Sequence, residues 1–258
     1  NSAEGCMPCL ADYDDMANTY NFINQPFTLL NYSNKQDTLF LDSGSIELKY
    51  SLTNNNGLPL INKIVSFSAD KYINEHYFEI NDEVFEHSNS LELLWYGGLR
   101  PTEEKEDEDV VYGSGIISQA GETESIQTKN AEENIVRDVF KGQTDWVAIR
   151  TKYFMSAIIA MNPGKYATLS GHNEKFGNRQ HTPLYNASIG FPLNVSTISS
   201  RIYLGPLDVD YLSQADVSLD ASMDWGFAPI RPISKGVLWV LKFMHHKLNL
   251  NYGFALLL

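Results

Sequence analysis

Residues 45–53, SIELKYSLT, alternate between apolar and polar side chains. Because successive side chains of a β-strand point to opposite faces, this period of two predicts a strand with one buried face. The apolar positions are Ile46, Leu48, Tyr50 and Leu52. Residues 54–57, Asn-Asn-Asn-Gly, tolerate positive φ and predict a hairpin turn directly after this strand.

Similar short strands are predicted along most of the chain before residue 205, at intervals that suit a sandwich or a barrel. They cover residues 61–68, 75–80, 91–96, 110–117, 124–128, 134–140 and parts of 176–201. Residues 145–160 (DWVAIRTKYFMSAIIA) form the longest apolar-rich run there, and their aromatic and β-branched side chains favour one long central strand. Gly205-Pro206 ends the last strand, and residues 208–214 predict one or two helical turns.

A dense acidic run, TEEKEDED, occupies residues 102–109 between two predicted strands. A calcium-binding EF-hand loop needs alternating oxygen ligands, a glycine at the turn and a closing glutamate, and this spacing is absent from the run. We therefore expect a solvated hairpin tip.

The C-terminal part, residues 225–258, contains no acidic side chain, although the whole chain has a formal net charge of −13. Within it, apolar residues recur at helical spacing and form one stripe. The stripe consists of Ile233, Val237, Val240, Leu241, Met244 and Leu248. Lys235, Lys242 and His246 lie on another face, with Trp239 and Phe243 beside them. This pattern predicts either an interfacial membrane helix or a helix packed on the domain core.

Net charge and composition limit the function classes. With 19 Lys and Arg against 32 Asp and Glu, the chain lacks the cationic footprint of a nucleic-acid-binding protein. Its 43% hydrophobic content is typical of a folded protein. Residues 1–20 show neither a basic start nor an apolar run, so they predict no signal sequence. We expect a cytosolic domain or a chain that starts downstream of its targeting element.

The two cysteines, Cys6 and Cys9, form a C-x-x-C motif in a polar stretch. A redox pair would need a helix N-terminus in a βαβ context, and a structural zinc site would need further ligands. We expect an incidental pair, or a local disulfide if the protein is exported.

Three stretches resemble the YidC family of bacterial inner-membrane insertases. Residues 94–99 with Thr102-Glu103 are similar to the family's apolar-Trp, Gly-Leu and Thr-Glu stretch. Residues 144–159 (TDWVAIRTKYFMSAII) are similar to its Trp-Val-Ala, Tyr-Phe and Ser/Thr-Ala stretch. Residues 224–258 resemble, in one register, its Trp-Gly, Pro-Ile-Ser-Lys, Leu-Trp, Leu-Lys-Phe-Met-His and Asn-Tyr-Gly-Phe-Ala series. The match is close over residues 91–258 and loose before them.

The resemblance implies an all-β fold, a β-supersandwich similar to the galactose-mutarotase group, with a C-terminal amphipathic helix. Residues 1–224 would form a periplasmic β-sandwich domain whose first strands are missing. Residues 225–249 would be an interfacial helix, and residues 250–258 a truncated start of a transmembrane helix. The apolar run there covers only the seven residues 252–258, which are too few to span a bilayer.

The resemblance also implies a function: the periplasmic part of an insertase and chaperone of inner-membrane proteins, acting alone or with the Sec translocon. Its partners would be the lipid bilayer, Sec translocon components and nascent membrane proteins, at the periplasmic side of the bacterial inner membrane. We expect Lys235, Trp239, Lys242 and Phe243 to set the helix in the membrane interface.

No catalytic, cofactor-binding or metal-binding residue is expected. The alternative is a carbohydrate-binding or mutarotase-like sandwich. For such acid–base chemistry the chain offers His76, His87, His172 and His181. None of these histidines lies in a recognisable catalytic motif.

Overall fold

The computed structural model describes residues 7–14, 19–22, 27–32, 38–87, 90–100, 106–128, 136–176, 178–223, 225, 229–248, 251 and 253. The chain divides into two compact units, Asn1–Ser218 and Leu219–Leu258.

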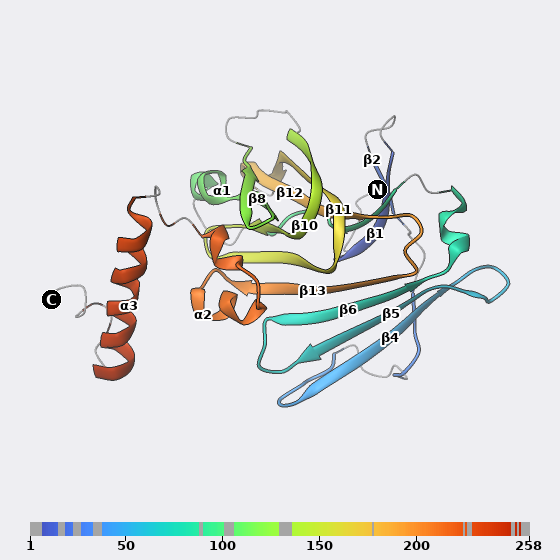
Figure 1. Cartoon of the computed structure of the whole chain (residues 1–258), viewed down its shortest axis with the longest axis horizontal. Helices are drawn as coiled ribbons and strands as arrows, with labels where there is room; N and C mark the ends of the chain where they lie inside the picture. Colours follow the sequence, from blue (N-terminus) through green and yellow to red (C-terminus); the bar gives the residue numbers. More distant parts are fainter. Residues whose placement is uncertain are drawn as a thin grey trace. The chain divides into compact units, whose positions relative to one another are not determined.

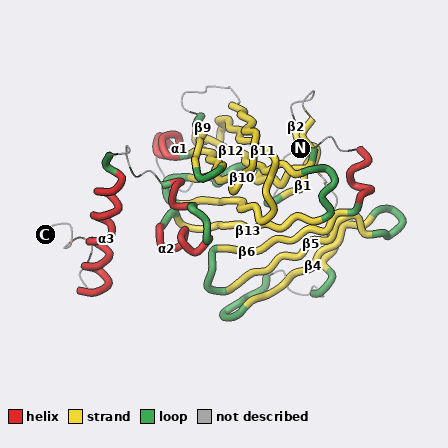
Figure 2. The backbone as a smooth tube through the Cα atoms, in the orientation of Figure 1, coloured by secondary structure: helices red, strands yellow, loops and turns green. Residues whose placement is uncertain are grey.

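The first unit is built almost entirely of antiparallel strands (Figures 1 and 2). Its strands are β1 (Cys9–Asp14), β2 (Thr19–Phe22), β3 (Thr28–Leu29), β4 (Ser45–Thr53), β5 (Pro59–Ser68), β6 (Ile73–Ile80), β7 (Leu91–Trp95), β8 (Ser114–Gln119), β9 (Glu122–Ile126), β10 (Val136–Arg150), β11 (Phe154–Phe176), β12 (Arg179–Phe191) and β13 (Thr197–Pro206). Short helices are η1 (Asp82–His87), α1 (Glu106–Tyr112), α2 (Val209–Leu212) and η2 (Ser213–Ala215). The expected all-β, sandwich-like fold is confirmed.

The strand β4 coincides with the stretch whose alternation predicted it. Leu48 of β4 pairs with Val65 of β5, and Val65 pairs with His76 of β6, so these residues share one face. The turn between β4 and β5 contains Gly57 with a φ of 80°, a conformation that glycine adopts without strain.

The hairpin of β10 and β11 links the two layers of the sandwich. The N-terminal part of β11 pairs with β13 and its C-terminal part pairs with β12. Register shifts in β10 between Lys141 and Trp146 mark the bend. Opposite them, a Cβ on Gly164 would lie 2.2 Å from Ile189 Cγ2. Only a residue without a side chain therefore allows the strands to approach this closely.

The core lies between the layers and consists mainly of branched aliphatic side chains from paired strands. Val147 of β10, Ile158 of β11 and Ile202 of β13 are aligned in register, and each is at most 2% exposed. Burying one such side chain contributes about 1.5–3 kcal/mol. The run at residues 145–160 is thus buried as expected, but as two strands joined by a turn at residues 151–153 rather than one strand. The turn is closed by the Thr151 N–H, which donates to Phe154 O at 2.8 Å.

The segment expected to be a strand at residues 110–117 is instead the end of helix α1 followed by β8. The Gly113 N–H donates to Asp109 O at 2.8 Å and ends the helix. Glu108 accepts a 2.7 Å ion pair from Lys152, and Asp109 is only 3% exposed. The described part of the acidic run is therefore a docked helix and not a solvated tip, because contacts 44 residues apart in sequence hold it. Residues 101–105 lie outside the described part.

The second unit contains η3 (Leu219–Ser222) and the amphipathic helix α3 (Arg231–Leu248). The expected C-terminal helix is confirmed, while the expected domain limits stay predictions. Of residues 250–258, only 251 and 253 are described. Among the described residues, no helix combines the length and apolarity needed to cross a membrane.

Candidate functional site

Helix α3 presents its apolar stripe at the surface. Ile233, Val237, Val240 and Leu248 are 63%, 52%, 46% and 56% exposed. Such apolar side chains, repeated on one face of a helix, are typical of a surface that binds a partner or a bilayer.

Of the four expected interface residues, the two lysines lie opposite this stripe, while Phe243, three residues from Val240, borders it. Lys235 and Val237 are two residues apart, about 200° around a helix of 3.6 residues per turn, and the same relation holds for Lys242 and Val240. Trp239 and Phe243, one turn apart, stack with ring centroids 5.8 Å apart. The structure therefore brings the two rings together and places the two lysines opposite the stripe.

Lys235 belongs to a group of interacting side chains that the sequence did not indicate. Its Nζ lies 3.3 Å from Asp220 Oδ2 and 5.1 Å from the ring centroid of Trp225. The Trp225 indole N–H donates to Asp220 O at 3.1 Å, and Ser234 Oγ donates to Trp225 O at 3.3 Å. We call Asp220, Trp225, Ser234 and Lys235 the helix bracket. Spacing gave no signal for it, since Asp220 and Lys235 are 15 residues apart across an irregular segment.

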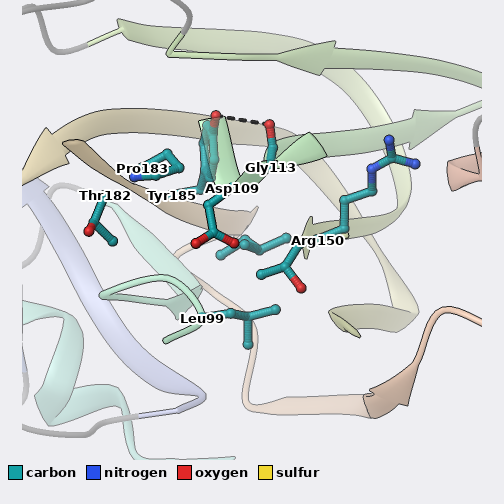
Figure 3. Close-up of a pocket in the computed structure, with 9 residues that line it drawn as sticks. Leu99, Asp109, Gly113, Arg150, Thr182, Pro183 and Tyr185 are labelled. Carbon is teal, nitrogen blue, oxygen red and sulfur yellow. Dashed lines mark hydrogen bonds between the residues drawn. The ribbon is translucent and has the colours of Figure 1, made fainter. Parts of the chain in front are cut away.

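The end of the β unit beside α1 holds a small cavity of about 10 Å³, enough for about one water molecule (Figure 3). Figure 3 shows the Asp109 carboxylate directed towards Leu99, and the guanidinium of Arg150 directed away from Asp109. Tyr185 donates to Gly113 O at 3.0 Å and accepts from the Thr128 N–H at 3.1 Å. Burial raises the pKa of Tyr185, so its hydroxyl keeps its proton. The cavity suits a structural water and is too small for an organic substrate.

A larger hollow of about 520 Å³ lies over β4, β5, β6 and β13. Its lining includes Glu47, Glu75, Tyr77 and Arg201. Arg201 reaches Asp216 at 3.5 Å, a long contact to a side chain that is 85% exposed. His76 also lines the hollow, and its lowered pKa keeps the imidazole neutral there.

Two buried titratable groups lie inside the β unit. Glu92 accepts hydrogen bonds from Ser188 Oγ and, at 3.0 Å, from Tyr166 OH, and burial raises its pKa. His76 has Nε2 2.6 Å from Asn74 Oδ1, and burial, with a smaller effect of the Lys63 charge, lowers its pKa to about 3. Both groups therefore favour their neutral forms in the folded protein.

Three of the four histidines considered for acid–base chemistry lie on separate strands, and His87 is the last residue of η1. His76 is on β6, His172 on β11 and His181 on β12, while the His87 side chain is not described. His172 contacts Glu174 at 2.8 Å. Across the ranges that the structure covers, no group of three His, Cys, Asp or Glu residues could hold a metal ion. Cys9 is disulfide-bonded, and Cys6 lies outside the described residues.

Comparison with known proteins identifies the family. A family model described as the YidC periplasmic domain matches residues 15–240, which include nearly all of the β unit and the first half of α3. The chain belongs to this family. The family's description is that of a periplasmic domain, and the resemblance seen in the sequence is confirmed.

Curated relatives carry the name membrane protein insertase YidC. The protein of Chlorobium phaeovibrioides is 27% identical over 84% of this chain and 37% of its own length. Those of Prosthecochloris aestuarii and Geotalea daltonii are 28% and 25% identical over 75% and 90% of this chain. They are covered over 33% and 42% of their lengths, so this YidC-family chain spans about two fifths or less of the relatives it matches.

Proposed function

We propose that this chain is the periplasmic part of a membrane protein insertase and chaperone, which helps inner-membrane proteins to insert and fold, alone or with the Sec translocon. The match of residues 15–240 to the periplasmic domain of YidC carries the proposal. Nascent membrane proteins are the proposed clients, and Sec translocon components the proposed partners. The proposed role is non-enzymatic. The carbohydrate-binding alternative has no specific observation in its favour.

Within this function, α3 is the proposed attachment to the bilayer. The exposed stripe of Ile233, Val237, Val240 and Leu248 would enter the acyl boundary, where each buried apolar group favours binding. Lys235, Trp239, Lys242 and Phe243 would remain on the headgroup and water side, and their positive charge would favour anionic lipid.

Vesicle binding by the whole chain tests this attachment. We expect binding to phosphatidylglycerol vesicles in a flotation assay, and we expect Val237→Asp to weaken it at least about tenfold, the equivalent of ~1.4 kcal/mol. The matched control is Val139→Asp on β10, since Val139 is 44% exposed and Val237 is 52% exposed. Equal binding by the two variants, or no binding by the unaltered chain, would remove the membrane role of α3.

The translocon partner requires a separate test. Purified Sec translocon in lipid nanodiscs is titrated with the labelled chain, and saturable binding is expected. A flat titration would remove the translocon from the proposal and would leave the attachment through α3 intact.

A further inference from the structure

Among the described residues, the helix bracket contacts α3 at two neighbouring positions near its N-terminus. All its helical contacts involve Ser234 and Lys235, through Ser234 Oγ to Trp225 O and Lys235 Nζ to Asp220 Oδ2. Lys235 is about 200° around the helix from Val237, in the middle of the apolar stripe. Ser234, in contrast, is about 60° from Val237 and borders the stripe. The contacts of Asp220 and Trp225 therefore reach the polar side of α3 and the margin of the stripe, while Val237 and Val240 stay exposed.

The bracket consists of three weak contacts to Ser234 and Lys235 and one hydrogen bond between Trp225 and Asp220 that holds their partners together. The ion pair joins side chains that are 53% and 35% exposed, so it is weak by itself. A cation–π contact of Lys235 with Trp225 and two hydrogen bonds supplement it. Because Trp225 contacts both Ser234 and Lys235 and is itself hydrogen-bonded to Asp220, a rotation of α3 about its axis would break the contacts to Ser234 and Lys235 together.

We propose that the helix bracket is a positioning device that fixes the rotation of α3 about its axis, so that the apolar stripe faces the bilayer and the lysine face points to water. This inference rests on the proposed attachment of α3 to the membrane. A helix held by chain connectivity alone would sample other rotations, in which the stripe lies partly in water. The bracket restricts those rotations before α3 binds the bilayer. This reduces the conformational entropy that is lost when the helix binds.

The test compares two positions on opposite sides of the helix. Val237 and His246 are nine residues apart, two and a half turns, so they face opposite directions. Each is replaced by Cys and labelled with an environment-sensitive NBD fluorophore; the described cysteine, Cys9, has no free thiol to compete. On phosphatidylglycerol vesicles we expect a strong emission increase at position 237 and almost none at 246.

Loss of the bracket is expected to reduce this contrast. Lys235→Gln and Asp220→Asn each remove the ion pair, and the ratio of the two emission increases should fall about fivefold, the equivalent of ~1 kcal/mol. Lys242→Gln is the matched control, because it removes the same charge from the same face of α3 without altering the bracket. The control should keep the contrast of the unaltered chain.

The outcomes separate the inference from the function on which it rests. A contrast that survives in both bracket variants, or that falls equally in Lys242→Gln, overturns the positioning role while the attachment to the membrane stands. No emission increase at either position in the otherwise unaltered chain overturns the attachment and the positioning role together.

Discussion

Replacing Tyr185 with Phe removes one oxygen atom at the point where three segments of the β unit meet. The hydroxyl donates to Gly113 O, between α1 and β8, and accepts from the N–H of Thr128, which follows β9. Tyr185 is 2% exposed and Thr128 is fully buried. The phenyl ring would still fill the same space, so the substitution isolates the polar contribution.

The expected loss of stability follows from the two partners left behind. A buried carbonyl and a buried amide each lose a hydrogen bond, and an unsatisfied buried polar group costs about 1–3 kcal/mol. We expect Tyr185→Phe to lower the free energy of unfolding by about 3 kcal/mol. Tyr203→Phe is the control, because its hydroxyl donates one local bond, to Pro206 O three residues away, and should cost about 1 kcal/mol.

Urea denaturation followed by circular dichroism measures both variants. The midpoint should fall while the slope stays unchanged, since a ring of the same shape leaves the exposed area on unfolding unaltered. Hydrogen exchange should also accelerate at β9 and α1, which lose their shared anchor. A midpoint for Tyr185→Phe no lower than that of Tyr203→Phe would refute the argument that this hydroxyl joins the three segments.

Other predictions concern buried charge and packing. Burial raises the pKa of Glu92 above its ordinary value near 4.5. The stability that the protonated Glu92 contributes to the folded state is therefore complete below pH 4.5 and is lost as the pH rises through the folded pKa. Glu92→Gln should abolish this loss in unfolding curves measured across that pH range. His76 acts in the opposite direction, because a pKa lowered to about 3 keeps it neutral while the unfolded chain takes up a proton near pH 6.5. Between pH 7 and pH 5 the native state should therefore lose about 2 kcal/mol through His76, and His76→Gln should show no such loss. A Cβ at position 190 would lie 2.1 Å from Tyr166 Cζ, so Gly190→Ala should lower stability by about 1–3 kcal/mol. The same change made in a Tyr166→Leu background should be nearly neutral, and an equal loss in both backgrounds would contradict the proposed clash.

Strands and helices that follow from local periodicity were predictable. The alternation in residues 45–53 gave β4 with its correct bounds, and the stripe of residues 233–248 gave α3. The helical turns expected at residues 208–214 appear as α2 and η2. In each case the deciding information lies within one short window, because side-chain direction repeats every two or 3.6 residues.

Features that depend on contacts between residues far apart in the chain could not be predicted from the sequence. The turn at residues 151–153 divides an apolar run that reads as one strand, and α1 replaces a predicted strand because Lys152 and Tyr185 hold it from 44 and 72 residues away. Likewise, the sequence placed Lys235 on a basic helical face, while the structure joins it to Asp220 and Trp225. The sequence by itself determined the strands and helices that follow from local periodicity, the amphipathic tail and, through its motifs, the family. Only the tertiary structure decided how β10 and β11 join two layers and which face of α3 is held, because those outcomes depend on contacts between residues that no local pattern relates.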